Sequence, residues 1–169
     1  MGNLKRNYGR KQAWRNNAIA QMVENLTDLG QKACLYAISK KGYDNQKYNL
    51  RDSIGSAVYV DGEIVPSSKR YAFKRKSSKG PYIDRGYNGT GEEETGRSAL
   101  DAYWEDNKKL KNYKNTVELV VIAGTFYAGI LQSSGIQVIS AATDYLQDKM
   151  HTYKSFKPKL RAFADEVML

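Results

Sequence analysis

The chain has 169 residues, a formal net charge of +9, a hydrophobic fraction of 41% and a mean hydropathy of −0.66. This length predicts one domain with a buried core. One cysteine, Cys34, and one histidine, His151, exclude an intrachain disulfide, a cysteine-based zinc finger and a multi-histidine metal site within one chain. No stretch reaches the roughly 18 apolar residues of a membrane span, and no apolar segment follows the basic N-terminus as in a signal peptide.

The first predicted element is a long amphipathic helix over residues 12–40. Seven apolar or small residues recur at steps of three and four along one stripe: Trp14, Ala18, Met22, Leu26, Leu29, Ala33 and Ala37. Gly42 follows two lysines and is expected just after the C-terminus of the helix. Gly30 is a candidate break within the pattern, and Cys34 is predicted to be a small buried residue of this helix.

A β-hairpin is the next predicted element. Residues 47–52 are expected to form an ordered loop or a short strand, and residues 54–60 the first strand of the hairpin. The dipeptide Asp61-Gly62 then predicts a type I′ turn, because such a turn needs positive φ at both central residues.

The return strand is predicted to be interrupted. It begins at Glu63 and stops at Pro66, because proline lacks the N–H that a central strand needs, and it resumes over residues 70–73. Residues 76–98 are rich in glycine, serine and charge, so we expect a long loop there. Loops of that length in a small domain are usually functional or disordered.

Helices and strands alternate in the second half of the chain. Ser98 is the expected N-cap of a helix that continues through Lys111. The apolar, β-branched run 117–123 predicts a buried strand. The remaining expected elements are an extended or helical turn at 126–131, a short strand at 136–138, an amphipathic helix at 138–150 and a second amphipathic helix at 156–167.

These elements predict an α+β fold. Its expected parts are a long N-terminal helix, a small antiparallel sheet, a helix packed across the sheet and a C-terminal amphipathic helix. The expected organisation is a basic arm at residues 1–11, one domain at 12–150 that contains the 76–98 loop, and a helical extension at 151–169.

Positive charge is concentrated in the first half of the chain. Residues 1–80 contain 16 lysines and arginines against 6 acidic residues, whereas residues 81–169 contain 11 against 12. Two acid-free runs supply candidate contacts with DNA or an acidic partner surface: Lys5, Arg6, Arg10, Lys11, Lys69, Arg70, Lys74, Arg75, Lys76 and Lys79. The alternative for these runs is a solvated basic loop. The acidic run Glu92, Glu93 and Glu94 is a candidate contact between subunits, with a solvated loop again as the alternative.

Catalytic patterns are absent from the sequence. The glycines between residues 80 and 96 are not followed by the Gly-Lys-Ser/Thr of a phosphate loop. His151 has no evident partner, and adjacent carboxylates such as Glu105-Asp106 do not face each other on a helix. We therefore expect no catalytic residue, cofactor or metal ion, and the chain is predicted not to be an enzyme. Thirteen tyrosines favour protein interfaces, and aromatics among the cations of 69–76 are typical of a nucleic-acid surface.

Three segments, in this order, carry a likeness to a known family. They are the long helix ending near residues 41–43, the segment 49–55 leading into 57–62, and the strand 119–123 running into 126–132. This order resembles the neck, head–tail connector and tail-completion proteins of tailed bacteriophages. Gln132 stands where that family usually has an acidic residue, and residues 136–140 occupy the place of its usual Arg-Pro-Phe. The loops are similar in style to those of phages of gut Bacteroidetes, including crAss-like phages.

The resemblance implies a virion protein that is assembled in the bacterial cytoplasm. It would form a homo-oligomeric ring, twelve- or six-fold, in the phage neck or tail between the portal and the tail. Its implied partners are the portal, adjacent connector and tail proteins, and the genomic DNA that passes through the ring. No membrane span is expected in the chain. The alternative is a basic DNA-binding or packaging accessory protein that acts without a ring. Self-association of the chain would favour the ring subunit, and DNA binding by a monomer would favour the accessory protein.

Overall fold

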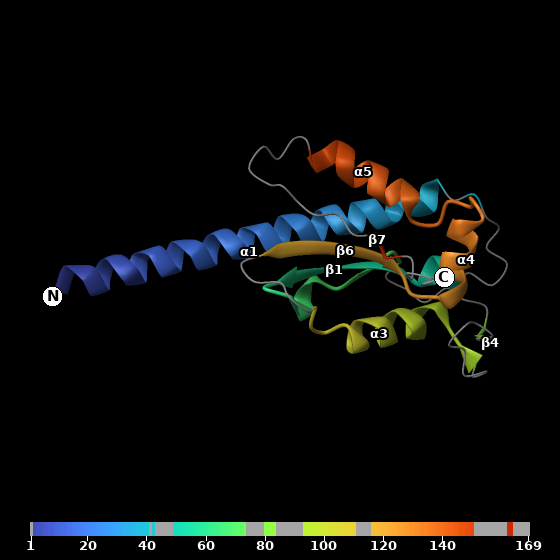
Figure 1. The fold of residues 1–169 in the computed structure, drawn as a ribbon, viewed down its shortest axis with the longest axis horizontal. Coiled ribbons are helices and arrows are strands. Elements are labelled where there is room, and N and C mark those ends of the chain that lie inside the picture. The colour runs from blue at the N-terminus through green and yellow to red at the C-terminus, as the bar shows by residue number, and fades with distance from the viewer. Residues whose placement is uncertain are drawn as a thin grey trace.

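The computed structural model describes residues 2–40, 42, 49–73, 80–83, 93–110, 116–150 and 162–163; for 2–11, 82–83, 93–94, 126, 150 and 162–163 it describes the backbone. The elements form layers (Figure 1). Helix α5 (Ser140–Met150) lies on α1 (Gly2–Ser39), α1 lies on one face of a mainly antiparallel sheet, and α3 (Gly96–Asp106) lies on the other face. The α+β class predicted from the sequence is confirmed.

Helix α1 is longer than predicted and only half of it is packed. It begins at Gly2, so the segment expected to be a basic arm, residues 2–11, continues the helix. A helix of this length extends about 57 Å, whereas a seven-residue strand spans about 23 Å. The N-terminal half of α1 therefore projects beyond the sheet (Figure 1). Trp14, expected on the buried stripe, is 75% exposed because no sheet lies beneath that half.

Gly30 does not break α1, contrary to one sequence expectation. A Cβ atom at Gly30 would lie 2.6 Å from Ser56 Oγ and 2.7 Å from Leu119 Cδ1 on the sheet below. The missing side chain thus lets the helix axis approach the sheet closely. Ala33 and Cys34, one turn further on, are fully buried, which confirms the prediction that Cys34 is a small core residue.

The sheet is built around two strands that pair along their whole length. Strand β1 (Ile54–Val60) runs antiparallel to β6 (Val117–Ala123), with seven residue pairs from Ile54↔Ala123 to Val60↔Val117. Both strands are buried on both faces. Val58, Leu119 and Val121 pack toward α1, and the alternate residues Ala57, Tyr59, Val120 and Ile122 pack toward α3. The predicted strands at 54–60 and 117–123 are confirmed.

The hairpin is also confirmed, with positive φ at both Asp61 (53°) and Gly62 (81°). Strands β2 (Glu63–Ile64) and β3 (Arg70–Tyr71) pair with opposite ends of β1, and the 3-10 turn η1 (Pro66–Ser68) separates them. The Val58 N–H donates to Ser68 Oγ at 2.8 Å, and the Ser68 hydroxyl donates to the Val65 carbonyl at 2.7 Å. Because an unpaired buried N–H is costly, Ser68 substitutes for the strand residue that is missing there.

The segment between the hairpin and α3 differs from its prediction. Residues 49–52, expected in a loop or strand, form the short helix α2 (Asn49–Asp52). The expected 76–98 loop contains β4 (Tyr82–Ile83) paired with β5 (Glu93–Glu94), and its last three residues begin α3. The N-cap of α3 is Thr95, which exchanges hydrogen bonds with Ser98 in a capping box, so Ser98 is not the cap. The helix ends at Asp106, before the expected Lys111.

The C-terminal third of the fold confirms one expectation and differs from three others. The turn after β6 becomes α4 (Phe126–Ser133), which fulfils the helical alternative for 126–131. Residues 136–138, expected as a strand, form an irregular turn. Ala162–Phe163, inside the expected 156–167 helix, instead form β7, which pairs in parallel with β6; the rest of that expected helix lies outside the described residues. Helix α5 packs mainly on α1 and not, as expected, directly on the strand 117–123.

Gln132 fixes the turn that leads into α5. Its side-chain oxygen Oε1 accepts hydrogen bonds from the Val138 N–H at 3.0 Å and the Ile139 N–H at 3.2 Å. Both residues are buried, and such N–H groups need an acceptor near a helix N-terminus. An oxygen acceptor is thus the chemical requirement at this position, and a carboxylate would meet it as well as an amide.

Gly30→Ala is expected to destabilise the protein by about 1–3 kcal/mol, because the added methyl overpacks the contact with Ser56 and Leu119. In an unpacked helix the same change would stabilise by about 0.5–1 kcal/mol. Urea unfolding monitored by circular dichroism measures the difference. An unfolding free energy equal to or above that of the unmodified protein would contradict the close approach.

Gln132→Leu is expected to lower the free energy of unfolding by about 1–3 kcal/mol, because two backbone donors lose their acceptor. Gln132→Glu is the matched control. Its carboxylate keeps an acceptor near the positive end of the α5 dipole, so this variant should unfold at or above the original midpoint at neutral pH. Equal loss in both variants would contradict the capping role.

Candidate partner-binding surfaces

The predicted basic residues lie in two different parts of the fold. Lys5, Arg6, Arg10 and Lys11 belong to the projecting half of α1. Lys69 lies between η1 and β3, and Arg70 is the first residue of β3, at the edge of the sheet. Lys74, Arg75, Lys76 and Lys79 lie outside the described residues, as does Glu92 of the predicted acidic patch. Glu93 and Glu94 form β5.

Three cations lie against aromatic rings at the β3 edge, and together with Arg70 of β3 they form what we call the cation–aromatic cluster: Arg51, Lys69, Arg70 and Arg97. The Arg97 guanidinium lies 3.5 Å from the ring centroid of Tyr71, and that of Arg51 lies 4.2 Å from the ring of Phe73. The Lys69 ammonium lies 5.4 Å from the ring of the buried Trp104. The cluster thus draws on β3, α2 and α3, which are distant in the sequence.

Hydrogen bonds to backbone carbonyls hold two of these cations in place. Arg97 donates through Nη2 to the Phe73 carbonyl at 2.7 Å. Arg70 donates through Nη1 to the carbonyls of Ser67 at 2.8 Å and Lys69 at 2.9 Å. Carbonyls and ring faces attract a cation without cancelling its charge, so the cluster keeps a positive potential. This is the electrostatics that a phosphate backbone or an acidic protein surface requires.

Two acidic residues reduce the positive charge of the cluster. Asp52 approaches Arg51, with 3.5 Å between the carboxylate Oδ1 and the guanidinium Nε, and Asp101 accepts a hydrogen bond from the Tyr71 hydroxyl. Burial raises the pKa of Tyr71, the hydrogen bond to Asp101 raises it further, and Arg97 opposes the shift. Tyr71 is therefore a neutral hydrogen-bond donor to Asp101 at physiological pH.

Arg51 and Arg97 were missed as candidate site residues. Neither lies in an acid-free basic run, because Asp52 follows Arg51 and an acidic run precedes Arg97. Their shared feature is a nearby aromatic ring, and only the packing of α2 and α3 against β3 brings each ring close. The sequence signal available was the aromatic content of residues 71–73 next to cations.

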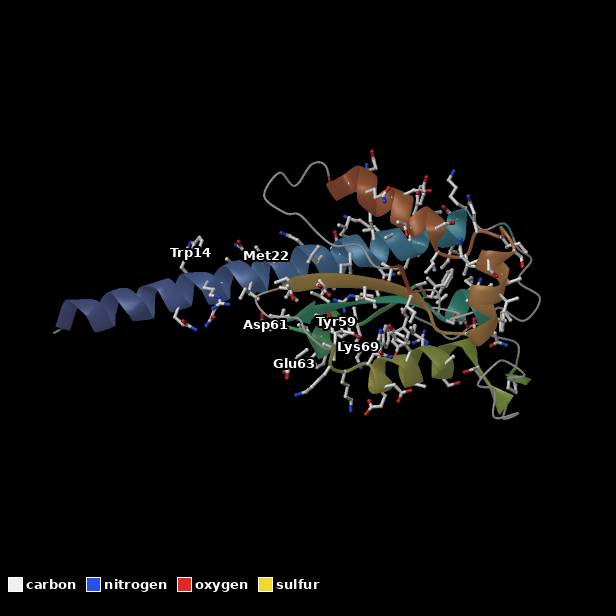
Figure 2. The ribbon with its side chains drawn as sticks, viewed as in Figure 1. Trp14, Met22, Tyr59, Asp61, Glu63 and Lys69 are labelled. Carbon is white, nitrogen blue, oxygen red and sulfur yellow. The ribbon has the colours of Figure 1, made fainter. Side chains whose placement is uncertain are left out.

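A groove lies between the projecting α1 and the β1–β2 hairpin, and we call it the hairpin groove. Its volume is about 970 Å³, and it is bounded by α1 residues from Gln12 to Gln31 and by hairpin residues from Val60 to Arg70. Figure 2 shows Asp61 and Glu63 at the hairpin tip beneath α1, and Trp14 on the side of α1 that faces away from them. The helix thus offers two faces to potential partners.

The described residues bear on metal binding, thiol reactivity and membrane spanning. They contain no group of three or more histidine, cysteine, aspartate or glutamate residues that could hold a metal ion. Burial raises the pKa of Cys34 to about 12, although the neighbouring Ser56 side chain opposes the shift, so the thiol stays protonated at neutral pH. Among the helices as far as they are described, none is long and apolar enough to cross a membrane.

No protein-family model, curated protein or solved structure matches this chain.

Proposed function

We propose that this chain is a structural subunit of a tailed-phage neck or tail, which self-associates into a ring that joins the portal to the tail around the DNA path. The order of its elements, which resembles the connector and tail-completion proteins, supports the proposal. Two structural features agree with it: the projecting half of α1 and the positively charged cation–aromatic cluster.

The projecting half of α1 is the single observation that carries this proposal. A subunit of a ring contacts each neighbour through two different surfaces, so it needs an element that reaches outside its own core. Every residue from 12 to 17 is exposed, including the large aromatic Trp14. Exposed aromatic residues on a projecting element are typical of protein interfaces.

The cation–aromatic cluster supports a second candidate function, DNA binding by a protein that forms no ring. Arg51 and Arg97, held against the half-buried rings of Phe73 and Tyr71, provide contacts to phosphate, and cations interleaved with aromatic rings are typical of surfaces that bind nucleic acid. The same cluster would serve a ring subunit that surrounds DNA. The two candidates differ in self-association, not in whether they bind DNA.

A ring subunit is expected to assemble in solution or on its partner. Sedimentation velocity and mass photometry of the full chain at low salt should give species larger than a dimer, at multiples of the 19.1 kDa protomer mass. Negative-stain images of these species should show closed rings. A protein that stays monomeric up to high concentration and does not co-purify with virions, yet binds duplex DNA, would support the second candidate instead.

Replacing three cluster cations, Arg51, Arg70 and Arg97, with glutamine is expected to weaken binding to duplex DNA. The slope of log affinity against log salt should become shallower by roughly one for each phosphate that the variant no longer neutralises. Fluorescence anisotropy over a salt series measures both effects. The matched control removes three cations elsewhere, Lys108, Lys109 and Lys149, all of them exposed. An equal loss in both triple variants would show that net charge alone matters.

A further inference from the structure

The hairpin groove has an apolar floor that no described part of the chain covers. Ile19 and Val23 of α1 face Val60 and Val65 of the hairpin across it. Acidic side chains of Glu24, Asp28 and Asp61 lie along its walls, together with Arg15 and Arg70. Such a combination of an apolar floor and charged walls suits an amphipathic helix of positive charge.

The projecting N-terminal segment of α1, residues 2–15, has that charge. It contains five lysines and arginines and no acidic residue. The groove follows α1 from residue 12 to residue 31, about 29 Å at 1.5 Å per residue, and the segment would be about 20 Å long. The segment is therefore short enough to lie within the groove, and its charge is opposite to that of the three acidic residues on the groove walls. Within one chain it cannot enter, because α1 itself forms one wall of the groove.

The segment also needs a partner to be a stable helix. Residues 2–17 include Gly2, Asn3, Asn7, Gly9, Asn16 and Asn17, all of them weak helix formers. A short helix of this composition is marginal in water, and most helical stability in proteins comes from packing. The side chains of residues 12–17 are exposed, so no described part of the chain supplies this packing, and a second chain is a source for it.

We infer that the hairpin groove of one copy of this chain receives the N-terminal segment of α1, residues 2–15, from a second copy. The basic segment lies against Glu24, Asp28 and Asp61 of the receiving copy. This contact rests on the proposed function in so far as it supplies the head-to-tail interface of the ring. Each subunit gives one segment and receives another, and a head-to-tail contact of this kind forms a ring when the rotation between subunits closes.

A charge exchange between two variants tests this contact. The first variant reverses the segment with Lys5→Glu, Arg6→Glu, Arg10→Glu and Lys11→Glu. The second reverses the groove wall with Glu24→Lys and Asp28→Lys. Each alone should weaken self-association by about tenfold or more, which corresponds to ~1.4 kcal/mol. An equimolar mixture should regain it, because each reversed surface then meets its complement. Sedimentation velocity at low salt measures all three samples.

The control variant Asp106→Lys with Asp144→Lys makes the same charge change as the groove variant at exposed positions of α3 and α5. It should associate like the unmodified protein. Recovery on mixing cannot come from a folding defect, because both chains in the mixture carry their substitutions. Single variants that associate normally, or a mixture that fails to recover, would overturn the contact.

The same measurements separate this contact from the proposed function. Ring-sized assembly that is insensitive to both charge reversals would overturn the groove contact and leave the ring. Association that stops at a dimer, with recovery on mixing, would establish the groove contact and overturn the ring. A chain that remains monomeric at every concentration would overturn the groove contact, and it would overturn the ring as well if the chain also failed to co-purify with virions.

Discussion

The antiparallel pairing of β1 with β6 is the interaction on which the rest of this structure depends. Seven residue pairs hold the two strands together, and their side chains alternate between two separate cores. A slip of one residue would send Tyr59 toward α1 and Val58 toward α3, so the register is strongly specified. The hairpin, the helices on both faces and β7 all attach to this pair.

The projecting half of α1 follows from the same constraint. Small residues such as Gly30 and Ala33 draw the helix onto the β1–β6 pair, and a larger side chain at Gly30 would collide with it. The pair supports a helix of that length only over its C-terminal half. One element thus contributes to the core at one end and to a potential interface at the other.

The edge of the sheet at β3 is protected and charged at once. An exposed strand edge is a site of unwanted pairing, which proteins limit with short strands and charged side chains. Strand β3 has two residues, and Lys69, Arg70 and Arg97 lie on or beside it. The positive charge that prevents pairing with another strand is also available to a phosphate backbone. Protection of the edge and binding of a polyanion are therefore compatible roles for the same residues.

The local sequence pattern was sufficient to predict the elements that depend on a few neighbouring residues. Alternation and β-branching predicted β1 and β6, the Asp61-Gly62 turn required positive φ, and Pro66 marked the interruption of the return strand. Gly30 was harder, because a glycine in a helix pattern is equally a break and a point of close contact, and only Ser56 and Leu119 on the sheet decide between them.

The tertiary structure decided which residues contact one another and which are buried. Trp14 belongs to the apolar stripe of α1 but is exposed, because the length of the sheet, which the helix pattern does not contain, determines where burial stops. Arg51 and Arg97 belong to the cation–aromatic cluster only because α2 and α3 place them against the rings of Phe73 and Tyr71. The sequence by itself determined where charge and apolar residues occur along the chain. Packing determined which of them meet, since that depends on contacts between residues far apart in sequence.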